Sequence, residues 1–108
     1  MSHDWKAQRA ETFETFAEMA GEVSLPKSAV VYYQFYAENI DPDWAAVEKA
    51  LKAKGFKTER DEEEGLIVAS IGPIPVTPDS IWEQEKIATE AVLDAEFFPD
   101  GWEMTTEE

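Results

Sequence analysis

The spacing of hydrophobic residues changes along the chain, and each spacing predicts a helix or a strand. Over residues 4–20 the apolar side chains recur every three to four positions, which predicts an amphipathic helix. Gly21 predicts its end, because glycine commonly closes a helix. The side of this helix that we expect to face the protein carries Trp5, Thr12, Phe13, Phe16, Met19 and Ala20.

The stretch SAVVYYQFYAEN, residues 28–39, alternates in twos and is rich in residues that favour strands. It therefore predicts a strand with two different faces. Val31, Tyr33 and Phe35 form one face, and Val30, Tyr32, Gln34 and Tyr36 form the other. We expect the first face in the core. The second, the tyrosine face, needs a cover, and we expect the N-terminal helix there; another copy of the chain and a bound ligand are the alternatives.

Two short sequences predict where later helices begin. In DPDW we expect Asp41 to cap a helix whose first position is the following proline, and Gly55 ends this helix. In VTPDS, Thr77 and its following proline repeat the pattern. The helix that begins there is expected to run to about Glu96.

Two further sequences predict the remaining strands. FKTER and GLIVASIGPI form a strand pair across the polar turn DEEEG. In FFPDGWEM, Pro99 stops the long helix and Asp-Gly forms a turn into a last short strand with Trp102 and Met104. The order becomes βαββαβ after an extra N-terminal helix. This predicts an α+β fold, the ferredoxin-like sandwich, in which two helices cover one face of an antiparallel sheet.

The chain is expected to form one compact unit, with an N-terminal amphipathic helix at residues 1–24 and the ferredoxin-like domain at 25–108. Its 24 acidic and 9 basic residues give a net charge of −15 over 108 residues. Residues 49–76 are neutral, whereas residues 77–108 carry ten acidic residues against Lys86 alone. Such a surface repels a phosphate backbone, so we expect no direct nucleic-acid binding. It serves solubility, or it attracts a basic partner.

The usual tools of catalysis are scarce. There is no cysteine, and His3 is the only histidine, so we expect neither an enzyme nor a metal or cofactor site. The acidic run of Asp61, Glu62, Glu63 and Glu64 lacks the spacing of a calcium loop and is expected to be a solvated hairpin turn. No apolar run is long enough to cross a membrane, which favours a cytoplasmic protein.

The long helix carries the main candidate for a binding surface. Trp82 and Leu93 lie off its broad apolar face, beside an acidic stripe of Glu83, Glu90 and Asp94. This Trp82–Leu93 strip either packs against the N-terminal helix or contacts a protein partner. Since one helix cannot easily cover both this strip and the tyrosine face, we expect one of the two to be open.

The order of elements, the segment GFKTERDEEEGLIVAS and the ending Asp100-Gly101-Trp102-Glu103 resemble the ribonuclease E inhibitor family, the regulators of ribonuclease activity of type B. The resemblance covers roughly residues 28–104. It implies a small acidic protein that binds ribonuclease E and lowers RNA decay without cleaving anything itself.

We therefore predict a non-catalytic inhibitor of ribonuclease E that binds a basic surface of its partner. The predicted contact residues are Trp82, Glu83, Glu90, Leu93 and Asp94, with weaker candidates at Asp61, Glu62, Glu63, Glu64, Asp100 and Trp102. The alternative is a ferredoxin-like module that binds a small ligand or forms a homodimer through its sheet, without a ribonuclease partner.

Overall fold

A computed structural model describes residues 3–105 of the chain as an N-terminal helix followed by a βαββαβ unit. The elements are α1 (Trp5–Glu22), β1 (Ser28–Ala37), α2 (Trp44–Ala53), β2 (Lys57–Asp61), β3 (Leu66–Pro75), α3 (Pro78–Leu93) and β4 (Phe97–Met104). The strands form one antiparallel sheet in the order β2-β3-β1-β4. The predicted ferredoxin-like α+β fold is confirmed. The outer bounds predicted for the two units, residues 1 and 108, lie outside the described residues.

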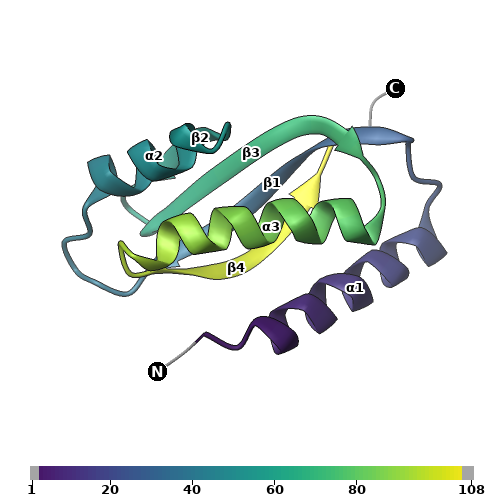
Figure 1. The fold of residues 1–108 in the computed structure, drawn as a ribbon, viewed down its shortest axis with the longest axis horizontal. Coiled ribbons are helices and arrows are strands. Elements are labelled where there is room, and N and C mark those ends of the chain that lie inside the picture. The colour runs from purple at the N-terminus through teal and green to yellow at the C-terminus, as the bar shows by residue number, and fades with distance from the viewer. Residues whose placement is uncertain (1–2, 106–108) are drawn as a thin grey trace.

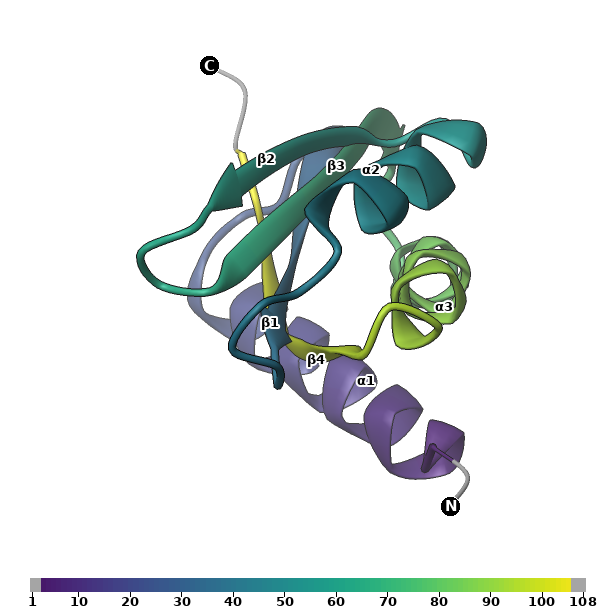
Figure 2. The same ribbon diagram turned by 90° about the vertical axis from the view of Figure 1, so that its left-hand side faces the viewer.

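Helices α2 and α3 cover the same face of the sheet, and Figure 2 shows them together on one side of it. The core lies between these helices and the inward side chains of β1, β3 and β4, with Tyr33 and Phe35 among the largest fully buried residues. The Tyr33 hydroxyl donates a hydrogen bond to the carbonyl oxygen of Ile81, at 2.8 Å. This bond satisfies the buried hydroxyl and ties the central strand to α3.

Helix α1 lies beside α3 and along the β4 edge of the sheet (Figures 1 and 2). The Trp5 and Trp82 rings meet edge to face, with centroids 6.2 Å apart. The expectation that this helix covers the tyrosine face is therefore wrong. The side of α1 that is buried is polar, with Gln8 and Thr12, and such groups need hydrogen-bonding partners that α3 supplies.

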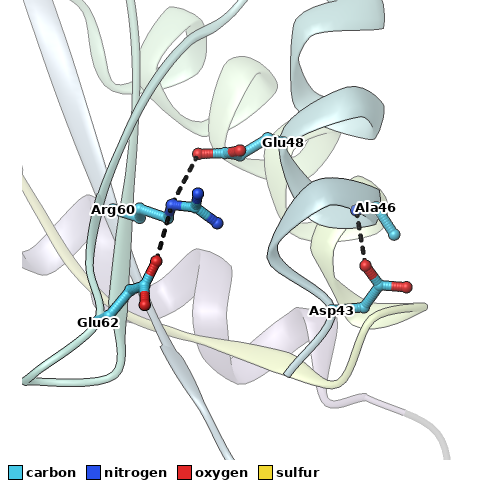
Figure 3. Close-up of polar contacts among 5 residues, drawn as sticks. All are labelled: Asp43, Ala46, Glu48, Arg60 and Glu62. Atoms are coloured by element: carbon cyan, nitrogen blue, oxygen red, sulfur yellow. Dashed lines mark hydrogen bonds and ion pairs between the residues drawn. The ribbon is translucent and has the colours of Figure 1, made fainter. Parts of the chain in front are cut away.

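Helix α2 begins later than predicted. Its N-cap is Asp43 and not Asp41, since the Asp43 carboxylate accepts a 3.0 Å hydrogen bond from the Ala46 amide (Figure 3). This start places Trp44 in the first turn, where its ring packs on Phe97 with centroids 5.3 Å apart. The predicted start of α3 is confirmed, because Thr77 accepts from the Ser80 amide at 3.1 Å.

Arg60 joins the edge strand β2 to the helical layer. Its Nε lies 3.8 Å from a Glu48 oxygen on α2 and 3.2 Å from a Glu62 oxygen in the following turn (Figure 3). The guanidinium carbon also lies 5.9 Å from the centre of the Trp44 ring. Arg60 thus faces the helical side of the sheet, while its neighbours in β2 alternate to the other side.

The last segment differs from its prediction in two ways. Helix α3 ends at Leu93, before Glu96, and β4 already begins at Phe97. Asp100 and Gly101 form a bulge within this strand, where the pairing with β1 shifts register, and not a turn before it. Gly101 has φ +117°, a conformation that glycine adopts easily. The bulge keeps Trp102 on the core side, opposite Tyr33.

Candidate functional site

A pocket of about 640 Å³ opens between α1, α3 and β4. One wall is α1, where Gln8 and Thr12 face inward, and the opposite wall is the Pro99–Trp102 segment of β4. Glu85 of α3 also lines the pocket, and Asp4, Glu11 and Asp100 add three more carboxylates to the lining. The pocket exists because α1 packs on α3 through polar side chains and leaves space beside the bulged strand.

Glu85 is the central polar group of this site, and it is only 4% exposed. Its carboxylate accepts hydrogen bonds from the Thr12 hydroxyl and, at 2.7 Å, from Gln8 Nε2. Gln8 Nε2 also donates to the Thr89 hydroxyl at 3.0 Å, and Gln8 Oε1 lies 2.5 Å from His3 Nε2. This network connects the first half of α1 to α3 and leaves none of its buried polar atoms without a partner.

Burial raises the pKa of the Glu85 carboxyl above its ordinary value of 4.5, because the charged form loses its hydration. The hydrogen bonds from Thr12 and Gln8 oppose this rise, and the negative charge of Glu11 adds to it. Burial, with a smaller effect of the Glu85 charge, also raises the pKa of the Tyr33 phenol far above its usual range. Perturbed groups in a pocket are typical of functional sites, so Glu85 marks this pocket as a candidate binding site.

The pocket is suited to a positively charged or hydrogen-bond-donating group. Its described lining offers carboxylates and the Trp102 indole, and contains no lysine or arginine. The lining hydroxyls belong to Thr12, which donates a hydrogen bond to the Glu85 carboxylate, and to Thr15. Binding is the chemistry that this arrangement favours.

The predicted Trp82–Leu93 strip is partly covered. Trp82 and Leu93 are half-buried, and α1 packs along the Trp82 side of α3 through Trp5. Glu83, Glu90 and Asp94 are exposed, as expected for a solvated acidic stripe. The carboxylates of the acidic stripe are therefore more accessible to a partner than the two apolar side chains.

The weaker candidate contact residues lie in two separate parts of the structure. Asp100 and Trp102 line the pocket. The acidic run of Asp61, Glu62, Glu63 and Glu64 forms the exposed β2–β3 turn, where the Asp61 carboxylate accepts a 3.2 Å bond from the Glu64 amide. Within residues 3–105, no group of three or more acidic or histidine side chains is placed to hold a metal ion, and no helix is long and apolar enough to cross a membrane.

The sequence analysis did not predict that Glu85, Gln8 and Thr89 form a buried polar group. A signal was present on the helical wheel of α3. Glu85 and Thr89 lie about 40° and about 80° around from Ile81, between the apolar face and Trp82. Polar residues inside an otherwise apolar arc indicate either a solvent-filled gap or a polar partner helix, and α1 supplies that partner.

No profile of a known protein family matches this chain, and no curated protein matches it significantly.

Proposed function

We propose that this chain is a non-catalytic acidic regulatory protein that binds a basic surface of ribonuclease E and inhibits it. The proposal starts from the resemblance carried by GFKTERDEEEGLIVAS and by Asp100-Gly101-Trp102-Glu103. The observation that supports it best is the accessible acidic stripe of Glu83, Glu90 and Asp94 on α3. In the part of the chain that the structure describes, the side-chain ion pairs all involve Arg60, which pairs with Glu48 and Glu62.

The exposed carboxylates of α3 and β4 therefore keep their negative charge available to a partner. Regions of a ribonuclease that hold RNA are expected to be basic, and an acidic surface attracts them over the distance of the ionic atmosphere. Binding there competes with RNA or holds a regulatory segment of the enzyme in an inactive arrangement. Neither route requires a catalytic group on this chain.

Titration calorimetry with the full-length ribonuclease E of the same organism tests the proposal. We expect saturable binding at micromolar affinity or better, weakening as the Debye length falls from about 10 Å at 0.1 M salt to about 3 Å at 1 M. The triple variant Glu83→Gln, Glu90→Gln, Asp94→Asn should bind more weakly and inhibit RNA cleavage less.

The matched control replaces Glu14, Glu18 and Glu22 by Gln, which removes the same charge from exposed positions of α1. If both triple variants lose affinity equally, net charge alone drives binding and the stripe on α3 is not the contact. Absence of heat at two well-separated temperatures, with a folded sample, contradicts the proposal altogether.

A second candidate function is the binding of a small cationic ligand, and the pocket around Glu85 is the observation that favours it. Carboxylates and an indole ring are the groups that hold organic ammonium ions. A thermal-shift series with small primary and quaternary ammonium compounds separates this function from the first. Here Trp102→Phe should retain the ligand, whereas Asp100→Asn should weaken it.

A further inference from the structure

On the face of the sheet opposite α2 and α3, no helix among residues 3–105 lies over the end of β1 (Figure 2). Tyr36 lies at this end, because β1 ends at Ala37. The strand register places four side chains across this end of the face: Asp61 of β2, Leu66 of β3, Tyr36 of β1 and Phe98 of β4. Directly opposed residues of antiparallel strands point to the same side of a sheet. This row, the Tyr36 row, is therefore a continuous surface across all four strands.

The centre of the Tyr36 row is aromatic and accessible. Tyr36 is 37% exposed, which makes it one of the few large hydrophobic residues that the fold leaves open. The Tyr36 and Phe98 rings lie side by side, with centroids 5.9 Å apart and planes tilted by 40°. Leu66 adds an aliphatic side chain on the β3 side of Tyr36. Together they form an apolar platform in which Tyr36 is exposed and Phe98 and Leu66 are half-buried.

A group of carboxylates borders this platform. Asp61 ends the row on β2, and the exposed turn of Glu62, Glu63 and Glu64 continues from it. The turn lies beside the end of β1, because the Ala37 amide donates a 2.8 Å hydrogen bond to the Gly65 carbonyl oxygen. One of these carboxylates, Glu62, pairs with Arg60; Glu63 and Glu64 form no ion pair with the described residues. Their charge is free to meet a cation that lies on the aromatic rings.

We propose that the Tyr36 row and its acidic turn form a docking surface for an arginine-bearing segment of a protein partner. A guanidinium group is planar and weakly hydrated, so it stacks on aromatic rings and pairs with carboxylates at the same time. Lysine has a strongly hydrated ammonium group and matches only the carboxylates. The combination of rings and adjoining acids thus selects arginine.

Two other occupants fit this surface less well. Nucleic-acid bases stack on exposed aromatic rings of a sheet, but the phosphates of RNA would then lie against the acidic turn. A second copy of the chain would bring the same acidic turns, and two net charges of −15, into proximity. Charge complementarity therefore favours a basic protein segment.

The inference deepens the proposed function, on which it rests for the basic character of the partner, but it places a contact on a different surface from the α3 stripe. It predicts two contacts on two faces of the molecule. A partner that spans both would contact an acidic helix stripe with one part and insert arginine side chains over Tyr36 with another.

The test titrates the full chain with an extended peptide in which arginines alternate with glycine and serine. Changes in the amide NMR shifts of the protein report where the peptide binds. The matched peptides carry lysine or citrulline in place of arginine. We expect the arginine peptide to bind most tightly and to shift the amides of Tyr36, Leu66 and Phe98. Tyr36→Ala should weaken binding by about fivefold, whereas Tyr36→Phe should retain it.

Variants of the acidic turn test the same inference if Tyr36→Ala fails to fold. The pair Glu63→Gln, Glu64→Gln should weaken arginine-peptide binding more than Glu83→Gln, Glu90→Gln, which removes the same charge from α3. Equal binding of the arginine and lysine peptides, or shifts confined to α3 and the pocket, overturns the inference. So does an RNA oligonucleotide that binds the Tyr36 row, or a dimer that buries it in solution.

The same samples separate this inference from the proposed function. If the protein binds ribonuclease E but the arginine peptide does not bind the Tyr36 row, only the inference is overturned. Arginine-peptide binding at the Tyr36 row in a protein that does not bind ribonuclease E overturns only the proposed function.

Discussion

Replacing Glu85 by Gln removes one buried titratable group from the contact between α1 and α3 while preserving the shape of the side chain. The free energy of unfolding should respond to pH in a defined direction. Burial raises the pKa of Glu85 in the folded protein above 4.5, so between these two pKa values the folded chain holds a proton that the unfolded chain has lost. The stability contributed by this proton is complete below pH 4.5 and is lost as pH rises through the folded pKa.

The glutamine side chain of the Glu85→Gln variant does not titrate, so the variant does not lose stability in this way as pH rises. The difference in unfolding free energy, variant minus wild type, should therefore rise with pH above 4.5, by at most about 1.4 kcal/mol per pH unit. For a domain of this size, about 1 kcal/mol corresponds to a shift in Tm of about 4–8 °C. The effect is therefore measurable over a single pH unit.

Urea unfolding followed by tryptophan fluorescence at several pH values above 4.5 provides the measurement. Glu83→Gln is the control, because it makes the same chemical change two residues away on the same helix at an exposed position. A difference that stays flat, or falls as pH rises, refutes the conclusion that burial outweighs the hydrogen bonds from Thr12 and Gln8.

Two further predictions concern stability. Trp102→Ala should lower the free energy of unfolding by about 2 kcal/mol, roughly half the loss for a fully buried Trp, because the ring packs against the core but also lines the pocket; a loss below about 0.5 kcal/mol in urea unfolding would show that the ring packs on nothing. Gly72→Ala should cost clearly more than Gly55→Ala, for which about 1 kcal/mol is expected from its φ of +94° alone. A Cβ at Gly72 would lie 2.8 Å from the Ala29 carbonyl oxygen and 2.9 Å from the Val30 Cα, whereas the space at Gly55 is open, so equal losses in the same assay contradict the steric argument.

Much of the fold follows from local sequence patterns. Alternation in twos predicted β1, and Thr77 with its following proline predicted the start of α3. These signals are local, since a strand and a helix cap depend on residues within a few positions of one another. The same locality explains the small errors. Asp41 and Asp43 both suit an N-cap, and packing of Trp44 on Phe97 favours the start after Asp43.

The candidate sites depended on contacts between distant elements. The helical spacing of α1 was clear from the sequence, but spacing does not say which of two surfaces a helix will cover. The buried Gln8 and Thr12 decided the matter, because they require polar partners and Glu85 and Thr89 of α3 provide them. That choice created the pocket beside Trp102 and left the Tyr36 row open.

Composition and short-range pattern were thus sufficient for the elements, their order and the acidic character of the surface. Packing in three dimensions was needed to establish that Glu85 is buried, that Asp100 and Gly101 bulge within a strand, and that Tyr36 lies beside Phe98. These features arise between residues distant in the chain. Their energies depend on desolvation and on mutual geometry, which no local pattern contains.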